Sequence, residues 1–152
     1  MLNLLVDTNI IVDCLKERQP FYEDACKLVM LGVMKDATLW ISNTQVTDAF
    51  YLLTDGGRRS RAEEVKRQLL WLLQVVKICT PDGEDLLAAL NSTWSDFEDA
   101  CVYQAALKVK ADAIITRNQA DFEKSSIRVF SCGELFERLA EEQGVTYDWV
   151  SW

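Results

Sequence analysis

Short runs of apolar residues alternate with amphipathic segments along this chain, and that alternation restricts its possible folds more than any other feature of the sequence. The runs are continuously apolar, as is typical of strands that are covered on both faces of a sheet. The predicted strands are Asn3 to Val6, Leu39 to Ser42, Val75 to Cys79, Ala113 to Thr116 and Arg128 to Phe130.

Between the strands, apolar residues recur at the spacing of one helix face. The predicted helices are Ile10 to Lys16, Tyr22 to Met34, Thr44 to Leu53, Arg61 to Leu73 and Phe97 to Val109. Strands that alternate with helices of this length need right-handed crossovers, which predict a mainly parallel sheet inside an α/β sandwich. A chain of 152 residues suits a single domain, which we expect to span residues 1–152.

The chain contains no histidine. This excludes the Ser/His and Cys/His nucleophile systems, the two-histidine ribonuclease mechanism and every histidine metal site. Any catalysis must therefore use carboxylates, lysine, thiols or a metal.

The net charge of −8 opposes nonspecific binding to nucleic acid and to an anionic membrane surface. A nucleic-acid ligand would therefore need a local basic patch. Clustered positive charge follows Asp55-Gly56-Gly57 and comprises Arg58, Arg59 and Arg61, extended by Lys66 and Arg67. The alternative interpretation of this cluster is a solvated helix face.

Five widely spaced cysteines form no Cys-x-x-Cys pair, and most of them lie among apolar residues. We expect reduced, buried thiols in a cytoplasmic protein. No signal peptide is expected, because Asp7 interrupts the first apolar run, and no run approaches the ~20 residues that span a bilayer. The C-terminal aromatic segment is too apolar for a free tail and is expected to dock on the body or on a second subunit. Its apolar residues are Tyr147, Trp149, Val150 and Trp152.

Acidic residues gather where the predicted strands end. Asp7 directly follows the first strand, Asp48 lies one to two turns into the helix after the second, and Asp121 follows the fourth closely. Asp96 and Asp99 share one face at the start of the helix before the fourth strand. Because ligands of open parallel sheets collect beyond the carboxyl ends of the strands, we expect these acids at one edge of the sheet.

Some of these acids also have a purely structural interpretation. Asp96 and Glu98 in a first helical turn complement the helix dipole, and we expect Ser95 and Glu98 to form a capping box. Asp7 could be a helix N-cap. Asp99 is harder to explain in this way, because an unpartnered carboxylate on the side that faces the sheet is expensive to bury.

Several carboxylates at one edge repel each other, by about 4 kcal/mol for a pair about 4 Å apart at an effective dielectric constant of about 20. A divalent cation removes that repulsion. Oxygen ligands without His or Cys suit Mg²⁺ or Mn²⁺. Such an ion polarises a phosphoryl oxygen and activates water, so the acids predict hydrolysis of a phosphodiester bond.

Two segments match a known pattern. The first is Val6-Asp7-Thr8-Asn9-Ile10-Ile11-Val12-Asp13. The second is Asp96-Phe97-Glu98-Asp99-Ala100, leading to Ile114-Ile115-Thr116-Arg117-Asn118-Gln119-Ala120-Asp121-Phe122. Together they resemble PIN domains, which are metal-dependent ribonucleases and in many cases the toxins of type II toxin–antitoxin pairs. The resemblance covers nearly the whole chain in length and in strand–helix order.

The resemblance implies a three-layer α/β/α sandwich with a short, mainly parallel sheet, an Mg²⁺ or Mn²⁺ site, and cleavage of RNA by an activated water. It implies that Asp7, Asp48 and Asp99 bind the metal, with Asn9 and Thr116 in supporting roles. The candidate RNA contacts are Arg58, Arg59, Arg61 and Arg117. The implied partners are single-stranded or structured RNA, an antitoxin protein and a second copy of the chain in a dimer, without a membrane.

Two positions depart from the family pattern. Asp48 stands where Glu is usual, and its shorter side chain would reach the ion through water. Asn118 replaces the commoner Asp, which leaves Asp121 and Asp96 as substitutes and would weaken metal binding. Some branches of the family carry this Thr116-Arg117-Asn118 form.

Other protein classes fit less well. A haloacid-dehalogenase-like phosphatase needs a second Asp where this chain has Asn9. A Rossmann or P-loop nucleotide binder needs a glycine-rich turn after the first strand, and the sequence has none. A catalytically weak PIN-like module that binds partners or oligomerises stays open, because Trp149, Trp152 and the acidic surface favour partner binding. The sequence does not identify the RNA.

Overall fold

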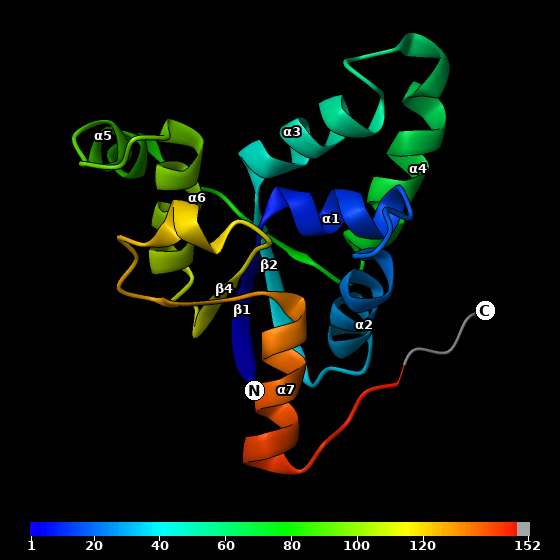
Figure 1. The fold of residues 1–152 in the computed structure, drawn as a ribbon. Coiled ribbons are helices and arrows are strands. Elements are labelled where there is room, and N and C mark those ends of the chain that lie inside the picture. The colour runs from blue at the N-terminus through cyan, green and yellow to red at the C-terminus, as the bar shows by residue number, and fades with distance from the viewer. Residues whose placement is uncertain (149–152) are drawn as a thin grey trace.

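Five parallel strands form the central sheet of the computed structural model, which describes residues 1–148 (Figure 1). The strands are β1 (Leu2–Val6), β2 (Ala37–Ser42), β3 (Lys77–Cys79), β4 (Ala113–Ile115) and β5 (Arg128–Phe130). Their order is β3-β2-β1-β4-β5, and each neighbouring pair is parallel. Strand β1 is therefore central, between β2 and β4.

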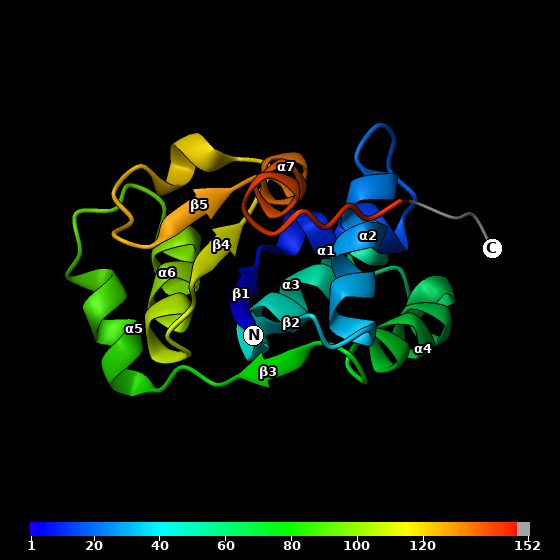
Figure 2. The same ribbon diagram turned by 90° about the horizontal axis from the view of Figure 1, so that it is seen from below.

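Helices cover both faces of this sheet, which gives three layers (Figure 2). One face packs against α1 (Thr8–Leu15), α2 (Tyr22–Val33), α3 (Asn43–Leu53), α4 (Ala62–Leu72) and α7 (Cys132–Gln143). The other face packs against α6 (Phe97–Lys108), on which α5 (Gly83–Leu90) rests. Two short 3₁₀ helices, η1 (Arg59–Arg61) and η2 (Gln119–Phe122), complete the fold. The predicted α/β/α sandwich is confirmed.

The alternation of side chains along β1 separates two cores. Leu4 and Val6 belong to the larger core beneath α1 and α2, whereas Leu5 points to the smaller core beneath α6. All three side chains are almost fully buried. This two-sided burial explains why the strand is continuously apolar in sequence.

Helices α5 and α7 were not predicted, although both begin with a recognisable capping signal. Asp82 and Asp85 form a capping box at α5, and Ser131 and Glu134 form one at α7. The capping box expected at α6 is wrong. Its N-cap is Asp96, not Ser95, because the Asp96 carboxylate accepts hydrogen bonds from the backbone N–H groups of the second and third helical residues.

The five cysteines are free thiols, and four of them are buried, with Cys101 half-buried. Tyr147 docks on the body, where its hydroxyl donates to Asp36 Oδ2 at 3.1 Å and its ring lies 5.9 Å from that of Phe136. Trp149, Val150 and Trp152 lie outside the described residues. Residues 1–148 contain no candidate membrane-spanning helix.

Candidate active site

Asp7 lies at the carboxyl end of β1, at the centre of the sheet edge. Its backbone N–H donates to Ile115 O of β4 at 2.9 Å, and its side chain caps α1. The residue is only 8% exposed. Burial raises the pKa of Asp7 above its usual value, although hydrogen bonds from Thr116 and Thr8 oppose the shift.

The Asp7 carboxylate accepts three hydrogen bonds. Oδ1 accepts from Thr8 N at 2.7 Å, and Oδ2 accepts from Thr116 Oγ1 at 2.7 Å and from Asn9 Nδ2 at 2.8 Å. Asn9 Nδ2 also lies 3.3 Å from Thr116 Oγ1. The side chains expected to support Asp7 are therefore in contact with it, and they hold its carboxylate in one orientation.

Asp99 lies in the first turn of α6 and is half-buried. Burial and the negative charges of Asp96, Asp7, Asp121 and Glu98 raise its pKa to about 7. Of these five acids, Asp7 follows β1, three lie at the start of α6 or at its N-cap, and Asp121 lies in η2. The structure therefore brings together acids that are far apart in the sequence, and their charges oppose the ionisation of Asp99.

Asp48 on α3 is half-buried and lies close enough to α6 to affect the ionisation of Glu98. Burial raises its pKa, and its negative charge raises the pKa of Glu98. Partial burial of the carboxyl group is the larger cause of the Glu98 shift, and Asp7 also contributes. Glu98, which the sequence indicated only as a complement to the helix dipole, is thus influenced by the charges of Asp48, Asp7 and Asp96.

The N-terminus of α3 is fixed to the end of β1, which explains the position of Asp48. Ser42 and Gln45 form a capping box at the start of α3. The buried Gln45 side chain also donates through Nε2 to Val6 O at 3.0 Å. Asp48 lies one turn further along the same helix, so it projects from a segment that is fixed beside Asp7.

The two substitutes for the fourth acid differ in their surroundings. Asp96 is committed to the cap of α6, where its Oδ1 accepts from Glu98 N at 2.8 Å and from Asp99 N at 3.2 Å. Asp121 is exposed on η2, and its negative charge raises the pKa values of Asp7 and Asp99. Asn118 is exposed, its backbone carbonyl accepts from Asp121 N at 3.0 Å, and its backbone N–H donates to Thr116 Oγ1 at 3.0 Å.

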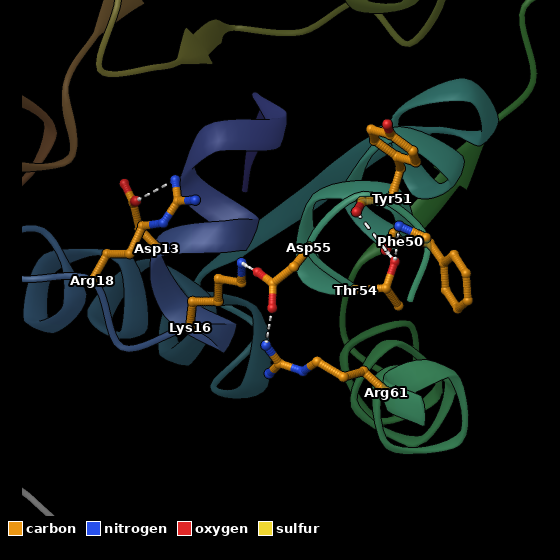
Figure 3. A network of polar contacts seen from close by, with 9 residues as sticks. Asp13, Lys16, Arg18, Phe50, Tyr51, Thr54, Asp55 and Arg61 are labelled. Atoms are coloured by element: carbon orange, nitrogen blue, oxygen red, sulfur yellow. Dashed lines mark hydrogen bonds and ion pairs between the residues drawn. The ribbon is translucent and has the colours of Figure 1, made fainter. Parts of the chain in front are cut away.

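Two of the four arginines predicted to contact RNA are engaged in ion pairs. Arg61 Nη1 lies 2.6 Å from Asp55 Oδ2, and Lys16 at the end of α1 pairs with the other oxygen of the same carboxylate at 2.5 Å (Figure 3). Arg117 pairs with Asp13. Arg58 and Arg59 are exposed and make no ion pair with any other residue of the described part of the chain, so their side chains are available to a ligand.

The donors at this edge suit a hard divalent cation, because they are carboxylate, amide and hydroxyl oxygens. The mutual repulsion that raises the pKa of Asp99 is the cost that a cation would remove. Within residues 1–148, however, no three Asp, Glu or Cys side chains are already arranged around one point. Mg²⁺ keeps several waters and is commonly held through one or two carboxylates, so Asp7 and Asp99 fit that ion without a full set of protein ligands.

Comparison with models of protein families identifies the family of this chain. The model of the PIN domain matches residues 3–120, a span that contains Asp7, Asp48 and the acids of α6. The chain belongs to the PIN domain family. The resemblance stated from the two sequence segments is thus confirmed. No match was found among curated protein sequences.

Solved structures share the fold of this PIN domain. FitAcB from Neisseria gonorrhoeae matches with a TM-score of 0.65 and 18% identity, over 86% of this chain and 98% of its own. VapBC2 from Rickettsia felis, bound to a DNA fragment from its promoter, gives 0.61 and 16%, over 86% and 98%. VapC20 from Mycobacterium tuberculosis, a toxin that cleaves the sarcin-ricin loop, gives 0.56 and 16%, over 73% and 86%. Identities this low establish a common fold.

Proposed function

We propose that this PIN domain is a toxin-type endoribonuclease that hydrolyses RNA phosphodiester bonds with Mg²⁺ or Mn²⁺. The observation that carries the proposal is the pairing of two unlike carboxylates at one sheet edge. Asp7 is fixed by three hydrogen bonds, and Asp99 has a pKa raised to about 7 by burial and by four neighbouring acids. The shared fold with VapC20 is consistent with the same class of reaction.

In this proposal Asp7 and Asp99 would hold the ion. Asp48 would bind the ion through a water molecule or would act by raising the pKa of Glu98. When bound, the ion supplies a polarised phosphoryl oxygen and a water of lowered pKa. Asn9 and Thr116 keep the Asp7 carboxylate aimed at the edge. We assign the Glu98 and Asp48 carboxylates, whose pKa values burial raises, as candidates to accept a proton from water.

RNA cleavage by the purified protein tests the proposal. With millimolar Mn²⁺ we expect cleavage that chelation abolishes, and Asp7→Asn and Asp99→Asn should each lower the rate by about 100-fold or more, because a lost ligand removes several kcal/mol of transition-state stabilisation. Glu137→Gln, which removes one exposed negative charge on α7, should keep the full rate. If Asp7→Asn cleaved RNA as fast as Glu137→Gln does, the proposed nuclease site would be wrong.

A partner protein is also proposed. An apolar groove of about 560 Å³ lies between α1, α2 and α4 and includes Leu15, Val29, Met30 and Trp71. Trp71 is half exposed there, and the net charge of −8 favours a basic partner. Because VapBC2 and FitAcB share this fold, we propose that an antitoxin segment occupies the groove.

Hydrogen exchange of the PIN domain with and without its antitoxin would test this docking. Protection of α1, α2 and α4 peptides is expected, and protection confined to other elements would contradict it. The alternative of a catalytically weak binding module predicts the same protection with no RNA cleavage. A homodimer stays a prediction.

A further inference from the structure

Asp13 is a buried acid that the proposed metal site does not use. It lies on α1, and its side chain has no exposed surface. Among the described residues, no donor is well aligned with either of its carboxylate oxygens. Since an uncompensated carboxylate is expensive to bury, its charge must be balanced by neighbouring cations.

Two arginines supply that balance at unequal distances. Arg117 Nε lies 2.7 Å from Asp13 Oδ2, whereas Arg18 Nη1 lies 4.0 Å from Oδ1 (Figure 3 shows Arg18). Burial raises the pKa of Asp13, and the charges of Arg117 and Arg18 oppose that shift. The short contact between Asp13 and Arg117 is therefore the main ion pair of this buried carboxylate.

Arg117 belongs to the segment that completes the site. It lies between β4 and η2, in neither element, and directly follows Thr116, whose hydroxyl donates to Asp7. Its backbone N–H donates to Asn9 Oδ1 at 3.4 Å. Its guanidinium lies 4.3 Å from the ring centre of Phe21, and the side chain is 28% exposed. The side chain of Arg117 is thus held between α1 and the start of α2.

We propose that Asp13 and Arg117 are positioning residues, whose buried ion pair fixes the segment 116–118 against α1 and so orients Thr116 and Asn9 on Asp7. This inference rests on the proposed function, because it concerns the same metal site. Arg117 is then a positioning residue in place of the RNA contact that the sequence predicted. The pair adds no net charge beside the site, so Arg117 does not repel an incoming cation.

Three measurements on three variants test the proposal: the melting temperature, Mn²⁺ affinity by calorimetry, and hydrogen exchange of the 116–118 segment. Asp13→Asn leaves Arg117 without its partner and should lower the melting temperature. In the double variant Asp13→Leu/Arg117→Met, apolar side chains of similar size replace the pair, which should restore much of the melting temperature. Asp55→Asn is the matched control, because it breaks the ion pairs with Lys16 and Arg61 away from the site.

We expect both Asp13 variants to bind Mn²⁺ at least about tenfold more weakly and to exchange the 116–118 amides faster, as is usual when support around a metal ligand is lost. Asp55→Asn should match the unmodified protein in Mn²⁺ affinity and in hydrogen exchange. Recovery of Mn²⁺ affinity together with the melting temperature in the double variant would overturn the positioning role, as would unchanged exchange. Failure of the unmodified protein to bind Mn²⁺ would instead overturn the proposed function, and with it any role at a metal site.

Discussion

Asp7 and Asp99 carry the same chemical group in opposite surroundings. The Asp7 carboxylate accepts three hydrogen bonds, whereas the Asp99 carboxylate accepts none from residues 1–148 and has four acids near it. The Asp7 carboxylate is therefore fixed in orientation, whereas the ionisation of Asp99 depends on the charges near it at the sheet edge. A cation would stabilise the ionised form of Asp99 more than that of an exposed acid.

This contrast predicts a pH dependence of stability for the metal-free protein. The folded state keeps a proton on Asp99 up to a pKa of about 7, whereas the unfolded chain releases it near pH 4. The stabilising contribution of the protonated group is thus complete below about pH 4 and is lost as the pH rises through about 7. In EDTA, the melting temperature of the unmodified protein should fall relative to that of Asp99→Asn over this interval. Parallel melting curves for the two proteins would contradict the assignment.

The residues of the edge differ in how far the sequence could predict them. Asp7, Asn9 and Thr116 follow from strand ends, because the carboxyl ends of neighbouring parallel strands meet. The place of Glu98 depends on how α3 and α6 lie across the sheet edge, and the pairing of Asp13 depends on a segment distant in the chain. No local sequence pattern predicts the position of Glu98 or the ion pair of Asp13.

At the scale of elements, α2 lies unusually close to the sheet and to the turn before β3. A Cβ on Gly32 would lie 2.7 Å from Val75 Cγ1 and 3.0 Å from Leu39 Cδ1. Leu39 is almost fully buried, so its side chain has little space to move away. The glycine therefore allows the helix to approach β2.

Gly32→Ala should destabilise the protein by about 1–3 kcal/mol, the usual cost of overpacking a core. Gly133→Ala on α7 is the control, because its Cβ would meet Asp24 Oδ2 at an ordinary 3.7 Å. That variant should be neutral or slightly more stable, since alanine favours the helix. Urea unfolding measures both. Equal stability of the two variants would show that the close approach at Gly32 can relax.

At the scale of the whole molecule, the strand order explains the site. The sequence predicted five strands and a parallel sheet, but not the order β3-β2-β1-β4-β5. That order depends on which crossovers pack best on each face, and it places Asp7 in the middle of the edge with Thr116 beside it. The missed α5 and α7 complete the outer layers without contributing an acid to the site.

The net charge of −8 opposes RNA binding, so a local cluster of positive charge must attract the RNA. Arg58→Glu/Arg59→Glu should slow RNA cleavage and lower the slope of log rate against log salt by about one for each phosphate that the arginines no longer neutralise. Arg58→Lys/Arg59→Lys keeps the charge and should retain most of the rate and slope. Unchanged kinetics in the charge-reversed variant would make this cluster a solvated surface.

Anomalous diffraction from a crystal soaked in Mn²⁺ tests the central claim most directly, because it locates the ion without reference to activity. We predict a peak about 2.1 Å from carboxylate oxygens of Asp7 and Asp99, the distance typical of small divalent ions. The same soak of an Asp7→Asn crystal should show no peak at that place. Bound Mn²⁺ elsewhere on the protein, with none between Asp7 and Asp99, would contradict the account.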